Sequence, residues 1–117
     1  MASITHFEIR ADVPNRAATF YSKVFGWNVN PAKGRAEHWT INAGKAQAGV
    51  GGSVAKRTNR DAIILRFDVA SVDDFLKKVH ANGGKVVAPK KYIPGLGIIA
   101  YCHDTEGNTF EVCEKRR

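Results

Sequence analysis

"HFEIRADVPNRAATFYSKVFGW", residues 6–27, changes its hydrophobic period near the middle. Its first part continues an alternation of apolar and polar side chains over residues 4–10, as in a strand that buries one face. Asp12 and Pro14 then form a helix start, because proline is tolerated in the first helical turn. Apolar side chains follow at helical spacing, at Ala17, Phe20, Tyr21 and Val24. The segment therefore predicts a strand and then a helix that ends at Gly26.

The polar face of this first strand carries side chains that could take part in binding or catalysis. Alternation places His6, Glu8 and Arg10 on one face, and Phe7 and Ile9 on the other. An imidazole, a carboxylate and a guanidinium on one face either meet water or line a pocket. The strand taken alone leaves both interpretations open.

Outward from this segment, the same order of elements occurs twice. Module one continues with strands expected over 27–30, 37–42 and 46–54. Module two predicts a strand over 62–69, a helix over 71–84, a strand over 85–88, a loop over 89–97 and a hairpin of 98–103 with 109–114. Ser71 is the expected N-cap of the second helix, with Asp74 at the capping-box position. Gly49, Gly51 and Gly52 indicate a bulge or a close approach to the backbone of the strand 46–54.

The length of 117 residues fits one domain with enough apolar content, 44%, to bury a core. The domain 1–117 divides into module one over 1–54, a polar and basic linker over 55–60, and module two over 61–117. No apolar run reaches the roughly 18 residues that a membrane span requires. The N-terminus lacks a secretory layout, and two cysteines outside a C-x-x-C pair suit a reducing compartment. We therefore expect a cytoplasmic protein with no membrane partner.

The chain is basic, with a formal net charge of +7. Its lysines and arginines are spread along the sequence, and no basic run interleaves aromatic residues as single-strand binders require. We therefore expect no nucleic-acid partner. A solvated basic surface and the attraction of small anionic molecules are the two interpretations that remain.

Three local sequences resemble those of the vicinal oxygen chelate superfamily. They are "NRAATFYSKVFGW" (15–27), "VHANGGKVVAPK" (79–90) and "AYCHDTEGNTFEVCE" (100–114), in which Thr105 stands where the superfamily usually has proline. With the repeated order of elements, the likeness covers nearly the whole chain. It implies an α+β fold whose paired βαβββ modules form a curved, cup-shaped mixed sheet with the helices outside.

The superfamily includes glyoxalase I, fosfomycin-resistance thiol transferases, extradiol dioxygenases and bleomycin-binding proteins. In its metal-using members, the first and fourth strands of each module supply the ligands, and the resemblance implies His6 and Glu111 at two of these positions. The other two fall at Ile64 and near the glycines of 49–52, which cannot ligate. Catalytic zinc generally has three protein ligands plus water. Two ligands would hold a divalent ion such as nickel, zinc, manganese or iron only weakly.

Two functions follow from the resemblance. In the first, the chain binds a small organic ligand, anionic if Arg66 contacts it, in a concave pocket without a complete metal site, with Trp39 and Tyr101 as pocket walls. In the alternative, it is a divalent-metal-dependent lyase or isomerase of the glyoxalase type, and Glu8 moves the proton. Structural interpretations also stand: Arg66 pairs with Asp68 or Glu8, and the aromatic residues belong to the core. Since a second subunit completes the cup in many relatives of this length, we expect a homodimer.

Overall fold

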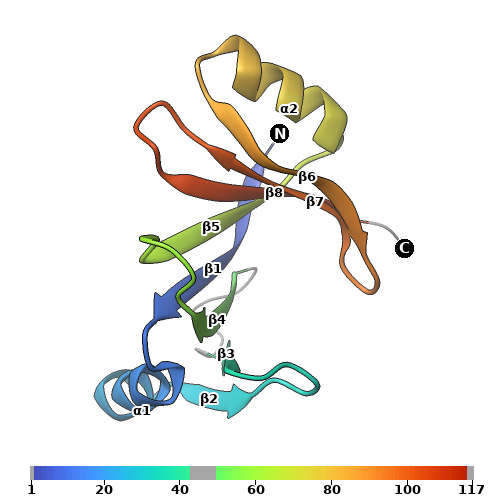
Figure 1. Ribbon diagram of the computed structural model, residues 1–117. Coiled ribbons are helices and arrows are strands. Elements are labelled where there is room, and N and C mark those ends of the chain that lie inside the picture. Colours follow the sequence, from blue (N-terminus) through green and yellow to red (C-terminus); the bar gives the residue numbers. More distant parts are fainter. Residues whose placement is uncertain (1, 43–49, 116–117) are drawn as a thin grey trace. The chain divides into compact units, whose positions relative to one another are not determined.

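The computed structural model describes residues 2–42 and 50–115 (Figure 1). Module one comprises β1 (Ser3–Ala11), α1 (Pro14–Phe25), β2 (Asn28–Pro31), β3 (His38–Asn42) and β4 (Gly51–Lys56). Module two comprises β5 (Ile63–Asp68), α2 (Val72–Ala81), β6 (Lys85–Ile93), β7 (Gly97–His103) and β8 (Thr109–Lys115). The described ranges thus hold a strand, a helix and three strands, twice, and the predicted α+β fold of two βαβββ modules is confirmed.

Two compact units account for these elements. The first unit holds residues 6–64, and the second unit holds residues 65–115 together with residues 2–5. Each unit has a run of paired strands from the eight-stranded order, one helix and its own hydrophobic core.

The sheet of the first unit has the strand order β2-β3-β4-β1. β1 and β4 run parallel, whereas β3 pairs antiparallel with both β2 and β4. The core of this unit is formed by Ala11, Ile41 and Val54. Phe7 and Ile9 of β1 pack against that core. Alternation therefore leaves the polar side chains of β1 on the other face of the sheet.

The sheet of the second unit has the strand order β5-β8-β7-β6. β5 and β8 run parallel, whereas β7 pairs antiparallel with β8 and β6. α2 lies across this sheet and contacts β6, β7 and β8 (Figure 1). The buried core of this unit is formed by Val69, Val72, Ala100 and Val112.

The two helices begin differently. α2 has the predicted N-cap, because the Ser71 hydroxyl accepts a hydrogen bond of 3.2 Å from the backbone N–H of Asp74. α1 begins at Pro14, as predicted, but its N-cap is Val13 rather than Asp12, and the Val13 side chain has no oxygen to offer the first turn. α1 ends as predicted, with Gly26 in the left-handed conformation at φ 71°. Within the described residues, neither helix is long and apolar enough to cross a membrane.

Only part of the predicted apolar stripe of α1 is buried. Ala17 packs against the core of the first unit, but Phe20 and Val24 are 55% and 56% exposed. Phe20 instead meets Tyr21 edge to face, with ring centroids 5.2 Å apart. Helical spacing shows which side chains share a face, but it does not show how far a neighbouring sheet covers that face.

Strand boundaries differ from the prediction at two places. Residues 89–93 were expected in a loop, but they continue β6 as far as Ile93. β6 is the last strand in the order of the sheet, where the missing N–H of Pro89 is tolerated, and a register shift between Ala88 and Lys91 spans this proline. In module one, Gly49 and the start of the expected strand 46–54 lie outside the described residues. β4 begins at Gly51 and continues through Lys56, into the expected linker.

Gly52 shows the close approach that its sequence context indicated. A Cβ at this position would lie 2.5 Å from Cζ of Phe7, whose ring covers the backbone of β4. Phe7 and Gly52 are direct partners in the parallel pairing of β1 with β4. The glycine therefore makes room for the ring inside the core of the first unit.

Candidate functional site

A chain of hydrogen bonds crosses the polar face of the first sheet, here called the β1–β4 network. His6 Nε2 lies 3.0 Å from Ser53 Oγ, and the Ser53 hydroxyl donates to Glu8 Oε1 at 3.1 Å. The other oxygen of Glu8, Oε2, accepts from Arg10 Nε at 2.6 Å. Ser53 is only 3% exposed, so this face is partly closed to solvent. Since the single hydroxyl proton goes to Glu8, His6 Nε2 carries a hydrogen and donates to Ser53.

Alternation and register explain this network. β1 contributes the predicted polar triplet of His6, Glu8 and Arg10, and parallel pairing places Ser53 of β4 directly beside Glu8. Burial lowers the pKa of His38 on neighbouring β3, the charge of Arg35 lowers it further, and that of Glu8 opposes the shift.

A second row of side chains crosses the sheet of the second unit. Arg66 on β5 and Tyr101 on β7 are both paired in register with Glu111 on β8, between them. Arg66 Nε donates to Glu111 Oε1 at 2.6 Å, and Glu111 is only 5% exposed. This Arg66–Glu111–Tyr101 row holds three of the residues that the sequence analysis singled out.

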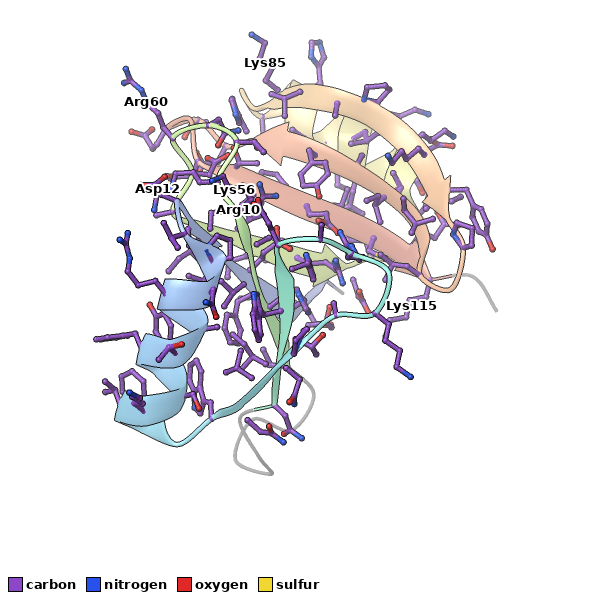
Figure 2. All side chains as sticks on the ribbon, turned by 60° about the horizontal axis from the view of Figure 1, so that its bottom comes forward. Arg10, Asp12, Lys56, Arg60, Lys85 and Lys115 are labelled. Atoms are coloured by element: carbon purple, nitrogen blue, oxygen red, sulfur yellow. The ribbon has the colours of Figure 1, made fainter. Side chains whose placement is uncertain are left out.

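Further charges share the face of this row. Lys115 Nζ lies 3.1 Å from Asp68 Oδ2. Asp68 Oδ1 accepts a hydrogen bond of 3.0 Å from the hydroxyl of Thr5. Lys85 and Lys91 of β6 pair with residues of β7 that alternate in phase with Tyr101, so they lie on the same face. Figure 2 shows where Lys85 and Lys115 leave the ribbon. Among the described residues, basic side chains outnumber acidic ones on this face.

Other predicted residues have structural surroundings. Trp39 packs against the core of the first unit, on the face of its sheet opposite the β1–β4 network. Ile64, which the resemblance places at one of the superfamily's metal-ligand positions, is buried. Cys113 is fully buried, and burial, with a further contribution from Asp68, raises the pKa of its thiol. A protonated, buried thiol is a poor nucleophile.

The two predicted metal ligands, His6 and Glu111, each contact another protein side chain. Within residues 2–42 and 50–115, no three His, Cys, Asp or Glu side chains gather as metal ligands would. His6 belongs to the first unit and Glu111 to the second. Each already has a protein partner, and the partner of Glu111 is a guanidinium that supplies positive charge to the carboxylate. The role of His6 and Glu111 as metal ligands stays a prediction.

Ser53 is the residue of this site that sequence reasoning missed. The glycines of the fourth strand in module one offer no side chain to a site, yet Ser53 of the same strand joins His6 to Glu8. The sequence shows that a serine lies in this strand. It does not show which residues the serine contacts, because the register of two strands about 45 residues apart is a tertiary property.

Comparisons with known proteins agree on the family. The sequence model of the Glyoxalase/Bleomycin resistance protein/Dioxygenase superfamily matches residues 3–112. A glyoxylase-like domain-containing protein of Didymella fabae is 34% identical, over 96% of this chain and 93% of that protein.

Solved structures share the fold at low identity. A glyoxalase/bleomycin resistance protein/dioxygenase superfamily member from Vibrio splendidus 12B01 aligns with a TM-score of 0.70 at 14% identity, over 99% of this chain and 100% of that one. Methylmalonyl-CoA epimerase from Mycobacterium tuberculosis aligns with a TM-score of 0.70 at 12% identity, over 97% and 88%. The repeated modules, the local sequences and these matches agree, and the chain belongs to the glyoxalase/bleomycin resistance protein/dioxygenase superfamily.

Proposed function

We propose that this protein binds a small organic anion on the polar face of its second sheet, at the Arg66–Glu111–Tyr101 row, without a metal ion. The observation that carries the proposal is the 2.6 Å hydrogen bond from Arg66 Nε to the buried Glu111 carboxylate. A buried carboxylate needs a counter-charge, and here the guanidinium supplies it.

The pair also prepares Arg66 to bind. A guanidinium has five N–H donors in a fixed fork, and Glu111 takes one of them through Nε. Holding the Nε edge fixes the orientation of the outer nitrogens, which suits two-pronged recognition of a carboxylate or phosphate. The Arg66 side chain is 21% exposed, so a ligand can reach it from the face that Tyr101 shares.

Charge on this face favours an anion. Its basic side chains are Arg66, Lys85, Lys91 and Lys115, and its acidic ones are Asp68 and Glu111. Such a surplus attracts anionic ligands and matches the basic character of the whole chain.

The alternative is a divalent-metal-dependent lyase or isomerase with His6 and Glu111 as ligands and Glu8 as the proton-transfer group. One observation favours the Glu8 part of it, since Ser53 joins Glu8 to His6 in the β1–β4 network. Both oxygens of Glu8 are occupied, however, by Ser53 and Arg10. The name of the similar epimerase describes a reaction, but at 12% identity that protein supports the fold alone.

A calorimetric titration with malonate and benzoate, on protein stripped of metal with EDTA, tests the proposal. We expect binding in EDTA, weakened about tenfold or more in Arg66→Gln. The matched control is Lys90→Gln, which removes one charge from an exposed lysine of the same unit. Tyr101→Phe, which keeps the packing of the ring, should also weaken binding. Circular dichroism checks that each variant is folded.

The opposite result would support the alternative. Binding that needs added nickel, zinc or manganese, and that survives Arg66→Gln but not His6→Ala, would overturn the metal-free site. The fluorescence of Trp27 and Trp39 follows the metal directly, and we expect no saturable change when these ions are added to the unmodified protein.

A homodimer is part of this proposal, based on the family resemblance. Sedimentation equilibrium tests it, and we expect the mass of two chains. A monomer at all concentrations would show that the homodimer proposal is wrong. The cytoplasmic location stays a prediction.

A further inference from the structure

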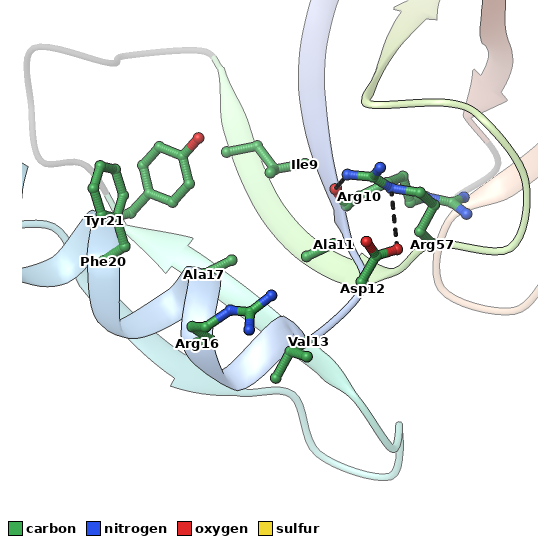
Figure 3. A pocket seen from close by; sticks show the side chains of 10 residues that line it. All are labelled: Ile9, Arg10, Ala11, Asp12, Val13, Arg16, Ala17, Phe20, Tyr21 and Arg57. Carbon is green, nitrogen blue, oxygen red and sulfur yellow. Dashed lines mark hydrogen bonds and ion pairs between the residues drawn. The ribbon is translucent and has the colours of Figure 1, made fainter.

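We propose a second binding site, on the α1 side of the first sheet, for a small phosphate monoester that carries an apolar group. A pocket of about 430 Å³ lies there, and all its lining residues belong to the first unit (Figure 3). They come from β1, from the turn that follows it, from α1 and from Arg57 just after β4. The site is separate from the Arg66–Glu111–Tyr101 row and does not rest on the function proposed for that row.

Three arginines are among the residues that line the pocket: Arg10, Arg16 and Arg57. Arg10 is held by Glu8, so its charge is already balanced. Arg57 Nε forms an ion pair with Asp12 Oδ1 at 3.7 Å, which is beyond hydrogen-bond distance, and Figure 3 marks this pair with a dashed line. Asp12 is the only acidic residue among the ten that line the pocket. The pocket is therefore positively charged.

Arg16 is placed against the usual electrostatics of a helix. It lies in the first turn of α1, where the helix dipole is positive and cations are unfavourable. That turn has no acidic residue, and its N-cap Val13 makes no side-chain hydrogen bond. No ion pair of Arg16 is seen in the part of the chain that the structure describes, and its side chain extends from α1 toward Ala11 and Asp12 (Figure 3). An anion in the pocket would relieve this unfavourable placement.

Arg57 Nε has Asp12 as an ion-pair partner, but this buried nitrogen has no hydrogen-bond acceptor among the described residues. The guanidinium is fixed from another side, because its Nη2 donates to the backbone oxygen of Arg10 at 3.1 Å. A buried N–H without an acceptor is unfavourable, so an anion oxygen within reach of Nε would be stabilised. Phosphate suits two guanidinium groups because it offers several oxygens and up to two negative charges.

The other end of the pocket is apolar. Its wall is formed by Ile9, Ala17, Phe20 and Tyr21. In Figure 3 the two aromatic rings stand away from the Arg10 and Arg57 guanidinium groups. A volume of about 430 Å³ is in the usual range for small-molecule sites. The pocket thus suits a ligand with a phosphate at one end and an aromatic or alkyl group at the other.

Titration of the full chain with phenyl phosphate tests this site. Tyr21 stacks on Trp27 with ring centroids 5.6 Å apart, so tryptophan fluorescence should report the ligand, and calorimetry gives the affinity. We expect Arg16→Gln and Arg57→Gln each to weaken binding about tenfold or more. Arg16→Gln should fold normally, because it removes a cation from the positive end of the helix. Phenol and inorganic phosphate should each bind more weakly than phenyl phosphate.

Two controls make the result decisive. Lys23→Gln removes the same charge from the last turn of α1, away from the pocket, and should change the affinity by less than about twofold. An equal loss in Lys23→Gln and Arg16→Gln would mean general charge attraction and would refute the site. Arg66→Gln separates the two proposals: if it alone abolishes phenyl phosphate binding, the second site is refuted while the function proposed for the row stands. Absence of saturable binding would refute the second site as well.

Discussion

At the scale of single residues, Glu111 is a buried charge whose removal from water must be compensated. Its carboxylate is buried on β8, and a charge out of water is tolerated only with a partner. Arg66 is that partner, at 2.6 Å, and the arginine itself is mostly shielded from solvent. Lys90 and Asp73 form an exposed ion pair at 2.7 Å in the same unit. Because the two pairs have nearly the same length but differ in exposure, comparing them shows how burial changes the contribution of an ion pair to stability.

Arg66→Ala should lower the free energy of unfolding by about 3 kcal/mol, because it leaves the buried Glu111 carboxylate without a counter-charge. Lys90→Ala should lower it by about 0.5 kcal/mol or less, since water screens the exposed pair. Urea denaturation followed by circular dichroism measures both changes. Equal effects would show that the Arg66–Glu111 pair is solvated and would weaken the proposed role of Arg66.

His38 links stability to pH. Burial first, and the charge of Arg35 second, lower its pKa in the folded chain. The unfolded chain therefore binds this proton more tightly, so the stability that neutral His38 contributes is present above about pH 6.5 and is lost as the pH falls through the lowered pKa. His38→Gln should show a smaller fall in Tm than the unmodified protein between about pH 7.5 and about pH 5.

The control for this measurement is His80→Gln, an exposed histidine in the last turn of α2. We expect its change of Tm with pH to match that of the unmodified protein. If His38→Gln matches it too, His38 does not titrate differently on folding.

At the scale of elements, β1 and β4 depend on one close contact. The Phe7 ring lies over Gly52, where any Cβ would overlap it, and both residues belong to the packed interior of the first unit. The glycine in β4 therefore has a packing role in addition to any effect on strand flexibility.

Gly52→Ala should destabilise the protein by about 1–3 kcal/mol, because an added methyl group displaces a packed ring. Phe7→Leu removes the overlapping atoms, so Gly52→Ala should be less harmful in its presence. A double-mutant cycle on the free energy of unfolding measures this coupling. Additive effects would mean that the clash at Gly52 does not arise from Phe7.

At the scale of the whole molecule, the start of the chain belongs to the second unit. Residues 2–5 are grouped with residues 65–115, whereas the rest of β1 belongs to the first unit. Ala2 packs against the core of the second unit, and Thr5 donates to Asp68 at 3.0 Å. One strand thus contributes to both units.

Thr5→Val keeps the shape of the side chain but removes the hydrogen bond to Asp68, and should lower the free energy of unfolding by about 1.5 kcal/mol. Thr40→Val is the matched control, because Thr40 is exposed on β3, and should change it by about 0.5 kcal/mol or less. Chemical denaturation of both variants gives the comparison. Equal losses would show that Thr5 makes no particular contribution to the second unit.

The elements were predictable because their signals are local. Alternation around Phe7, helical spacing after Pro14, the Ser71 N-cap and Gly26 all act within a few residues, and all appear in the structure. The errors arose where the position of a segment in the sheet determines its structure. Residues 89–93 could extend β6 past a proline only because β6 lies at the edge of its sheet.

The candidate site was predictable in its residue types but not in its pairs. Sequence by itself determined the repeated βαβββ order, the family resemblance and the polar faces that carry His6, Glu8, Arg66 and Glu111. Only the tertiary structure decided that Ser53 joins His6 to Glu8, and that Glu111 bonds to Arg66. The physical reason is that parallel strands such as β1 with β4, and β5 with β8, meet across about 45 residues, and their register depends on how each whole sheet packs on its helix.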